Sequence, residues 1–253
     1  MSKYNSNFLE KVILRLDFDD VSLAQLSDYQ QKVSDVFDIN TAQNGFEGTF
    51  NIDVVDGVMS QSKSELSIWE LKSTTSPDKK ISFSQKWISI EYNNKSYIDS
   101  DGLISDVDKY IQTFLEDFDV KIITRIGLRY INQITIPELE SPLVWDQYIN
   151  ADLLGSLRFA RERKSPLARN FTQHYYNLSS ASLTFSHGIW NDDFPNAINA
   201  NSYILDFDCN SSIPRDVSDV SLRTEIKSYN GIVEEYFEAS IQDSLRDIMG
   251  AHE

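Results

Sequence analysis

The chain has 253 residues, 41% of them hydrophobic and 25% charged, and this ordinary globular balance argues against a disordered protein. The formal net charge of −16 repels polyanions, which disfavours duplex nucleic acid and anionic membrane surfaces as main partners. Cys209 is the single cysteine, so an intrachain disulfide and a cysteine-based zinc site are both excluded.

We predict the cellular location from the absence of two apolar signals in the sequence. No stretch approaches the apolar length that a membrane span requires. The opening residues are polar and then alternate, without the apolar core of a signal peptide. We therefore expect a cytoplasmic protein without a membrane partner.

The first part of the chain predicts strands with two helices between them. Alternating apolar residues predict strands at 11–18, 49–55 and 67–73, and on either side of a tight turn at 84–86. Apolar residues spaced three and four apart predict helices over 21–37 and 103–118. The letters NGFEG at 44–48 are typical of a turn.

Residues 125–137, RIGLRYINQITIP, predict a long strand that ends at a proline. Its even-numbered positions are apolar except for Asn132. A buried amide needs partners, so Asn132 either bonds neighbouring backbone groups or addresses a ligand in a cavity. Arg129 lies on the opposite face, where we expect it to pair with an acidic residue.

The second part of the chain begins after a candidate linker at 137–142. A helix is predicted over 143–163, strands at 171–179, 180–190 and 202–210, and one long helix over 221–250 with Gly231 as its weak point. The apolar stripe of that final helix packs either on the sheet of its own chain or against a second copy of the chain. The second alternative would make a homodimer.

The expected fold class is α+β, with a mostly antiparallel sheet, helices packed on one face, and room for two similar β-then-α halves. The halves would be 1–137 and 138–253, the second ending in the long helix, within one compact unit.

Three stretches carry a family resemblance: GLRYIN at 127–132, YILDFD at 203–208, and IVEEYFEASIQDSLRDIMG at 232–250. With them the chain resembles a sporadically distributed, functionally uncharacterised family of prokaryotic proteins of about the same length. The resemblance implies one unit of conserved length. Scattered occurrence is typical of defence or toxin–antitoxin genes, so it also implies such a setting. It supplies no catalytic residues.

A metal site is one interpretation of Asp206 and Asp208, which lie two apart on one strand face. His174 or His187 would then be a further ligand. The alternative is that both carboxylates are solvated, and that His187 is a core residue because it alternates with Leu183, Phe185 and Ile189.

A basic cluster at 158–164 stands out from the acidic background. Its members are Arg158, Arg161, Arg163 and Lys164, with Arg169 nearby. They could clamp a phosphate or an acidic partner surface, or they are simply the solvated end of a helix.

The sequence has no Walker loop, dinucleotide fingerprint, metalloprotease helix or nucleophile elbow. The leading hypothesis is therefore a non-enzymatic binding or scaffold protein with a protein partner and no cofactor. The alternative is a metal-dependent enzyme or small-ligand receptor for a phosphate-containing ligand, using Asn132, Arg129, the two aspartates and a histidine. A third interpretation is an acidic mimic of nucleic acid.

Overall fold

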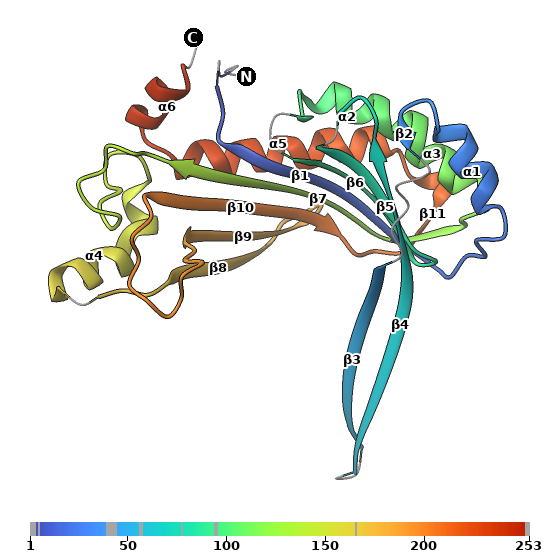
Figure 1. Ribbon diagram of the computed structural model, residues 1–253, viewed down its shortest axis with the longest axis horizontal. Coiled ribbons are helices and arrows are strands. Elements are labelled where there is room, and N and C mark those ends of the chain that lie inside the picture. The colour runs from blue at the N-terminus through green and yellow to red at the C-terminus, as the bar shows by residue number, and fades with distance from the viewer. Residues whose placement is uncertain are drawn as a thin grey trace. The chain divides into compact units, whose positions relative to one another are not determined.

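The computed structural model describes residues 4, 6–38, 45–55, 58–76, 78–93, 96–164 and 166–250. The protein is α+β with a mostly antiparallel sheet, as the sequence predicts (Figure 1). The strands are β1 (Leu9–Phe18), β2 (Phe37–Asp38), β3 (Gly45–Val55), β4 (Val58–Ser73), β5 (Lys79–Phe83), β6 (Trp87–Asn93), β7 (Ile122–Thr135), β8 (Asn170–Asn177), β9 (Ser182–Ile189), β10 (Ser202–Ser211) and β11 (Arg215–Asp216).

The helices are α1 (Leu26–Val33), α2 (Ser100–Asp106), α3 (Gln112–Asp117), α4 (Gly155–Arg163), α5 (Leu222–Ser240) and α6 (Asp243–Met249). A π-helical turn, η3 (Val107–Ile111), joins α2 to α3, and short 3-10 turns lie at η4 (Ala151–Leu154) and η5 (Val217–Asp219). In the part of the chain that the structure describes, no helix combines the length and apolarity needed to cross a bilayer.

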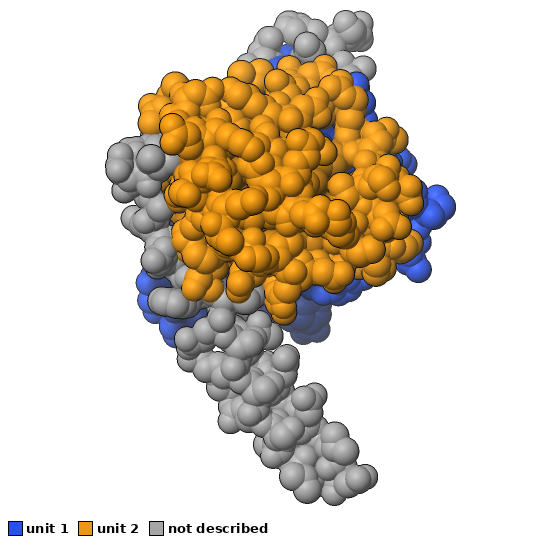
Figure 2. Space-filling view, turned by 90° about the vertical axis from the view of Figure 1, so that its right-hand side faces the viewer, with its two compact units in different colours: residues 1–12, 128–211, 225–253 blue, residues 13–127, 212–224 orange. Residues whose placement is uncertain are grey.

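The chain forms two compact units, coloured separately in Figure 2. Unit 1 comprises residues 1–12, 128–211 and 225–253, and unit 2 comprises 13–127 and 212–224. The chain passes between them within β1, β7 and α5 and directly after β10. Unit 1 thus takes residues from both predicted halves, and the predicted division after residue 137 stays a prediction.

Unit 2 contains the strand order β2-β4-β5-β6, with β3 paired to β4 and β11 to β7. Its core is aromatic: the Tyr29 ring of α1 meets Phe83 of β5 edge-on at 5.6 Å and Phe114 of α3 at 5.2 Å. These contacts explain why α1 and α3 bury the apolar stripes that the sequence shows.

Two predictions in unit 2 need correction. The helix expected over 21–37 ends at Val33, because Phe37 pairs with Ser73 in β2 and packs its ring 5.0 Å from that of Tyr110. The turn expected at 44–48 is wrong for residues 45–48, which belong to β3; Asn44 lies outside the described residues. The tight turn between β5 and β6 and the helix over 103–118 are confirmed.

Unit 1 is built on the antiparallel order β10-β9-β8, with α5 over one face. We call that covered side the inner face. The ring of Phe237 in α5 lies 6.4 Å from Phe207 of β10, and Tyr236 lies 5.0 Å from Tyr176 of β8. Tyr130 of β7 donates to the Asn230 amide oxygen of α5 at 2.8 Å. The predicted strand at 125–137 and its buried even-numbered face are confirmed.

Two helices of the second part differ from prediction. The helix expected over 143–163 begins only at residue 151, and the helix expected over 221–250 breaks between Ser240 and Asp243 rather than at Gly231. Both differences share a cause: Ile149 and Ile241 form a β-bridge, which requires extended backbone at both positions. Gly231 remains helical within α5.

Candidate functional site

The candidate site lies on the face of β8, β9 and β10 opposite the inner face, which we call the open face. The strand register places Gln173, Ser186 and Asp206 in one row across the three strands, and Tyr175, Thr184 and Asp208 in the next. Residues of one row project to the same side, because opposed residues of antiparallel strands share a face. A polar surface therefore runs across all three strands.

An arginine–carboxylate pair closes one side of this surface. Arg129 of β7 donates from Nε to Asp206 Oδ1 at 2.8 Å and from Nη2 to Asp206 Oδ2 at 2.6 Å. This confirms the expectation that Arg129 pairs with an acidic residue. Hydrogen bonding to Asp206 raises the pKa of the Arg129 guanidinium above its ordinary value. The bidentate geometry holds the Asp206 carboxylate in place, so it is not available as a general base.

Beside this pair lies a pocket of about 160 Å³. Its lining consists of Arg129, Gln173, Thr184, Ser186, Asp206 and Asp208. Gln173 donates to the Ser186 hydroxyl oxygen at 2.9 Å and accepts from the Tyr175 hydroxyl at 2.5 Å, so the neutral side chains form a connected network. The lining carries one positive and two negative formal charges, which favours a cationic group over an anionic one.

Exposed aromatic side chains flank the pocket. On β8, Phe171 is 36% and Tyr175 76% exposed, and they alternate with Gln173 along the strand. Trp190, directly after β9, is 45% exposed and meets the Phe171 ring edge-on at 5.6 Å. The Arg169 guanidinium lies 4.0 Å from the Trp190 ring and 4.7 Å from that of Phe194. Arginine held among exposed aromatic rings is the composition that protein interfaces favour.

The histidines lie on the inner face, away from the two aspartates. His187 is opposite Leu205 in the ladder, whereas Asp206 is opposite Ser186. A site combining Asp206 and Asp208 with either histidine is therefore not formed, because the sheet separates them. His187 is 3% exposed and its Nδ1 lies 2.8 Å from the Tyr203 hydroxyl, as expected of a core histidine. Burial, followed by the neighbouring His174, lowers the pKa of His187 to about 4.

Asn132 also points away from the pocket. It is 7% exposed and its amide donates to the Leu205 carbonyl oxygen at 3.4 Å. It thus bonds backbone, the first of the two roles considered for it. Asn132 and Arg129 project from opposite faces of β7, so they do not converge on one ligand.

The basic cluster is largely engaged with its own unit. Arg158 and Arg161 of α4 both bond Asp146, at 2.9 and 2.7 Å, and Arg163 lies over the Phe159 ring at 5.3 Å. Hydrogen bonds from Arg161, and then Arg158, lower the pKa of the Asp146 carboxyl. The two paired arginines have a carboxylate already, which leaves a smaller positive field for a phosphate. Their ligand-binding role stays a prediction.

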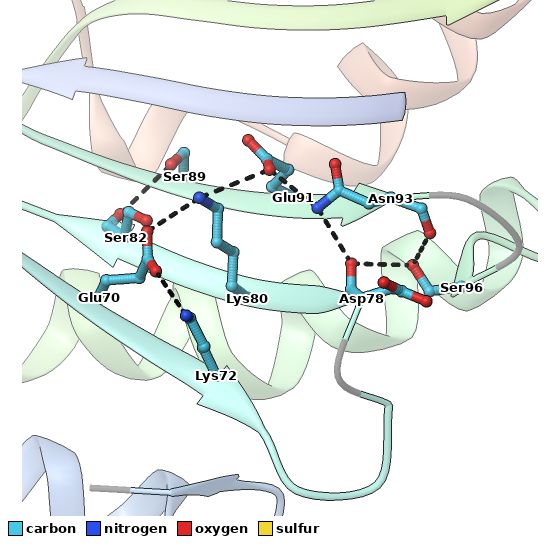
Figure 3. Close-up of polar contacts among 9 residues, drawn as sticks. All are labelled: Glu70, Lys72, Asp78, Lys80, Ser82, Ser89, Glu91, Asn93 and Ser96. Carbon is cyan, nitrogen blue, oxygen red and sulfur yellow. Dashed lines mark hydrogen bonds and ion pairs between the residues drawn. The ribbon is translucent and has the colours of Figure 1, made fainter. Parts of the chain in front are cut away.

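The comparable surface of unit 2 is an ion-pair network (Figure 3). Lys80 lies 2.9 Å from Glu70 and 3.5 Å from Glu91, and Lys72 lies 3.7 Å from Glu70. Charges of opposite sign alternate along adjacent strands, as expected of a solvated sheet surface. We therefore do not place the site there.

Periodicity placed Asp206 and Asp208 on one face but did not find Gln173, Thr184, Ser186 or Trp190. Only the pairing of β8 with β9 and of β9 with β10 brings Gln173, Thr184 and Ser186 to the aspartates, and Trp190 is placed by its ring contact with Phe171. Alternation predicts that the strand FTQHYYN has two faces, but it does not say which face is covered. Its exposed aromatic residues were a usable signal for the open face.

Among the described residues, no group of three or more histidine, cysteine, aspartate or glutamate side chains is arranged to hold a metal ion. No family model, curated protein or solved structure matches the chain.

Proposed function

We propose that the protein is a non-enzymatic, cytoplasmic binding protein whose open face holds a basic side chain of a protein partner. The observation that carries the proposal is the pocket between Arg129, Asp206 and Asp208, with exposed aromatic rings beside it. The partner's cation would meet the carboxylates, and its apolar neighbours would cover the rings.

The volume of the pocket favours a partner's side chain over a free small molecule as its occupant. Pockets for drug-sized ligands have volumes of about 300–1,000 Å³. The pocket here has about 160 Å³, enough for a guanidinium or ammonium head but small for a whole ligand. Stable interfaces bury about 800 Å² per partner, so the partner must also cover Phe171, Tyr175 and Trp190.

Charge disfavours the alternative of a phosphate-containing ligand. The one cation of the pocket, Arg129, is already bidentate to Asp206, and Asp208 adds a second negative charge to the lining. A phosphate would have to displace a carboxylate from arginine. The net charge of −16 further favours a basic partner through long-range attraction. A role in a defence or toxin–antitoxin locus would fit such a partner and rests on the family resemblance.

The test is selection of a displayed random-peptide library on the purified protein, followed by affinity measurement with the selected peptides. We expect enriched peptides to carry arginine or lysine beside an apolar residue. Asp208→Asn should weaken their binding about tenfold, or about 1.4 kcal/mol.

Asp247→Asn is the matched control, because it removes the same charge from an exposed position of α6 in the same unit. It should leave affinity within about twofold, since an exposed charge far from a contact is screened by salt. Equal weakening by both variants would reduce the effect to net charge and refute the proposal. Turnover of a nucleotide or phosphoester with divalent metal would also refute it.

A further inference from the structure

Two histidines face each other on the inner face of unit 1. His174 of β8 is diagonal to His187 of β9 in the ladder, and their Nε2 atoms lie 3.3 Å apart. The two rings are nearly parallel, with an interplanar angle of 4° and centroids 5.4 Å apart. The third histidine of the chain, His252, lies outside the described residues.

We propose that His174 and His187 bind a divalent transition-metal ion such as Zn²⁺ through their Nε2 atoms. A Zn–N bond is about 2.1 Å, so two imidazole nitrogens at tetrahedral positions lie about 3.4 Å apart. The observed 3.3 Å is close to this separation. The same distance also allows a weak hydrogen bond from His174 Nε2–H to His187 Nε2 in the metal-free protein. The ion would take the place of the proton between the two Nε2 atoms, with little change in their separation.

Tyr203 supplies the support that metal-binding histidines usually have. Its hydroxyl lies 2.8 Å from His187 Nδ1, and its ring is fully buried against Trp145, with centroids 5.3 Å apart. With Nδ1–H donating to the Tyr203 oxygen, the Nε2 lone pair of neutral His187 points toward His174. An oxygen partner on the remote ring nitrogen fixes the tautomer and the ring orientation of a ligating histidine.

The donor set indicates the class of metal. Imidazole nitrogen suits Zn²⁺, Cu²⁺ and Ni²⁺, whereas Mg²⁺ and Ca²⁺ require oxygen ligands. Asp206 and Asp208 cannot contribute because they project from the open face. The chain therefore supplies two ligands from its described residues, and water completes the coordination. The ion would tie β8 to β9, whose other face carries the pocket, but the inference does not depend on the proposed function.

The experiment uses the full chain, freed of metal with a chelator and titrated with Zn²⁺ alone by calorimetry. A parallel sample receives Cu²⁺ alone, and pulsed electron paramagnetic resonance counts the coordinated imidazoles. We expect one equivalent of metal and two imidazoles. His174→Gln, at a half-buried ring, should lower affinity at least tenfold and leave one imidazole. Tyr203→Phe should weaken binding about tenfold.

His252→Gln is the matched control and should bind as the unmodified chain does. Circular dichroism of each variant separates loss of the site from loss of the fold. If His174→Gln retains full affinity while folded, or if Cu²⁺ in the unmodified protein shows fewer than two imidazoles, the proposal is overturned.

Discussion

Asn132 provides the sharpest test of how unit 1 is packed. Replacing it by aspartate should destabilise the protein by about 3 kcal/mol or more at pH 7. The side chain is 7% exposed, and its amide nitrogen donates to the Leu205 carbonyl oxygen at 3.4 Å. A carboxylate there would lose that donor, face another acceptor and be buried without a cation, which costs several kcal/mol.

The same reasoning gives a pH dependence and a milder variant. Burial raises the pKa of the introduced carboxyl in the folded state, so the deficit should appear above about pH 4 and grow as pH rises. Asn132→Leu should change stability by less than about 1 kcal/mol, because a long, weak hydrogen bond is exchanged for apolar burial.

The assay is urea unfolding followed by circular dichroism, at pH 5 and pH 7, for each variant. Gln133→Glu is the control: it places the same charge one residue away on an exposed position of β7 and should cost less than about 0.5 kcal/mol. If Asn132→Asp unfolds at the same urea concentration as Gln133→Glu, Asn132 is not buried in an apolar face and the account of unit 1 fails.

Three further predictions concern other parts of the chain. Gly188→Ala should cost about 3 kcal/mol or more, since φ is +133° and a Cβ would lie 2.2 Å from the Asn170 carbonyl oxygen; Gly231→Ala, with nothing within 4 Å, should stabilise α5 by about 0.5–1 kcal/mol. Equal thermal shifts for these two would contradict the backbone argument. Asp146→Asn should cost under about 1 kcal/mol at pH 7, and the cost should shrink as pH falls from the ordinary carboxyl pKa through the lowered folded-state pKa, because protonation removes the charge that the arginines stabilise; a loss independent of pH would exclude the ion pairs as its cause. Tyr130→Phe should cost about 1 kcal/mol in urea unfolding through its lost bond to α5, and no loss would mean that this bond contributes nothing.

Local periodicity predicted the strands well, because side-chain alternation is imposed by the strand itself. The strands β1, β7, β8, β9 and β10 all fall where alternating residues place them. Local periodicity failed where contacts between residues far apart in the chain determine the backbone conformation. Ile241 continues the helical stripe of the last helix, yet its pairing with Ile149 makes it extended and separates α5 from α6.

The amino-acid sequence by itself determined the α+β class, the buried face of 125–137 and the opposed directions of Asn132 and Arg129, since these follow from composition and from a two-residue repeat. Only the tertiary structure decided which side chains lie next to one another on neighbouring strands. The register of β8, β9 and β10 joins Gln173, Ser186 and Asp206 into one surface and sends the histidines to the other side. Pairing between strands far apart in the chain depends on the whole packed sheet, and no single segment encodes it.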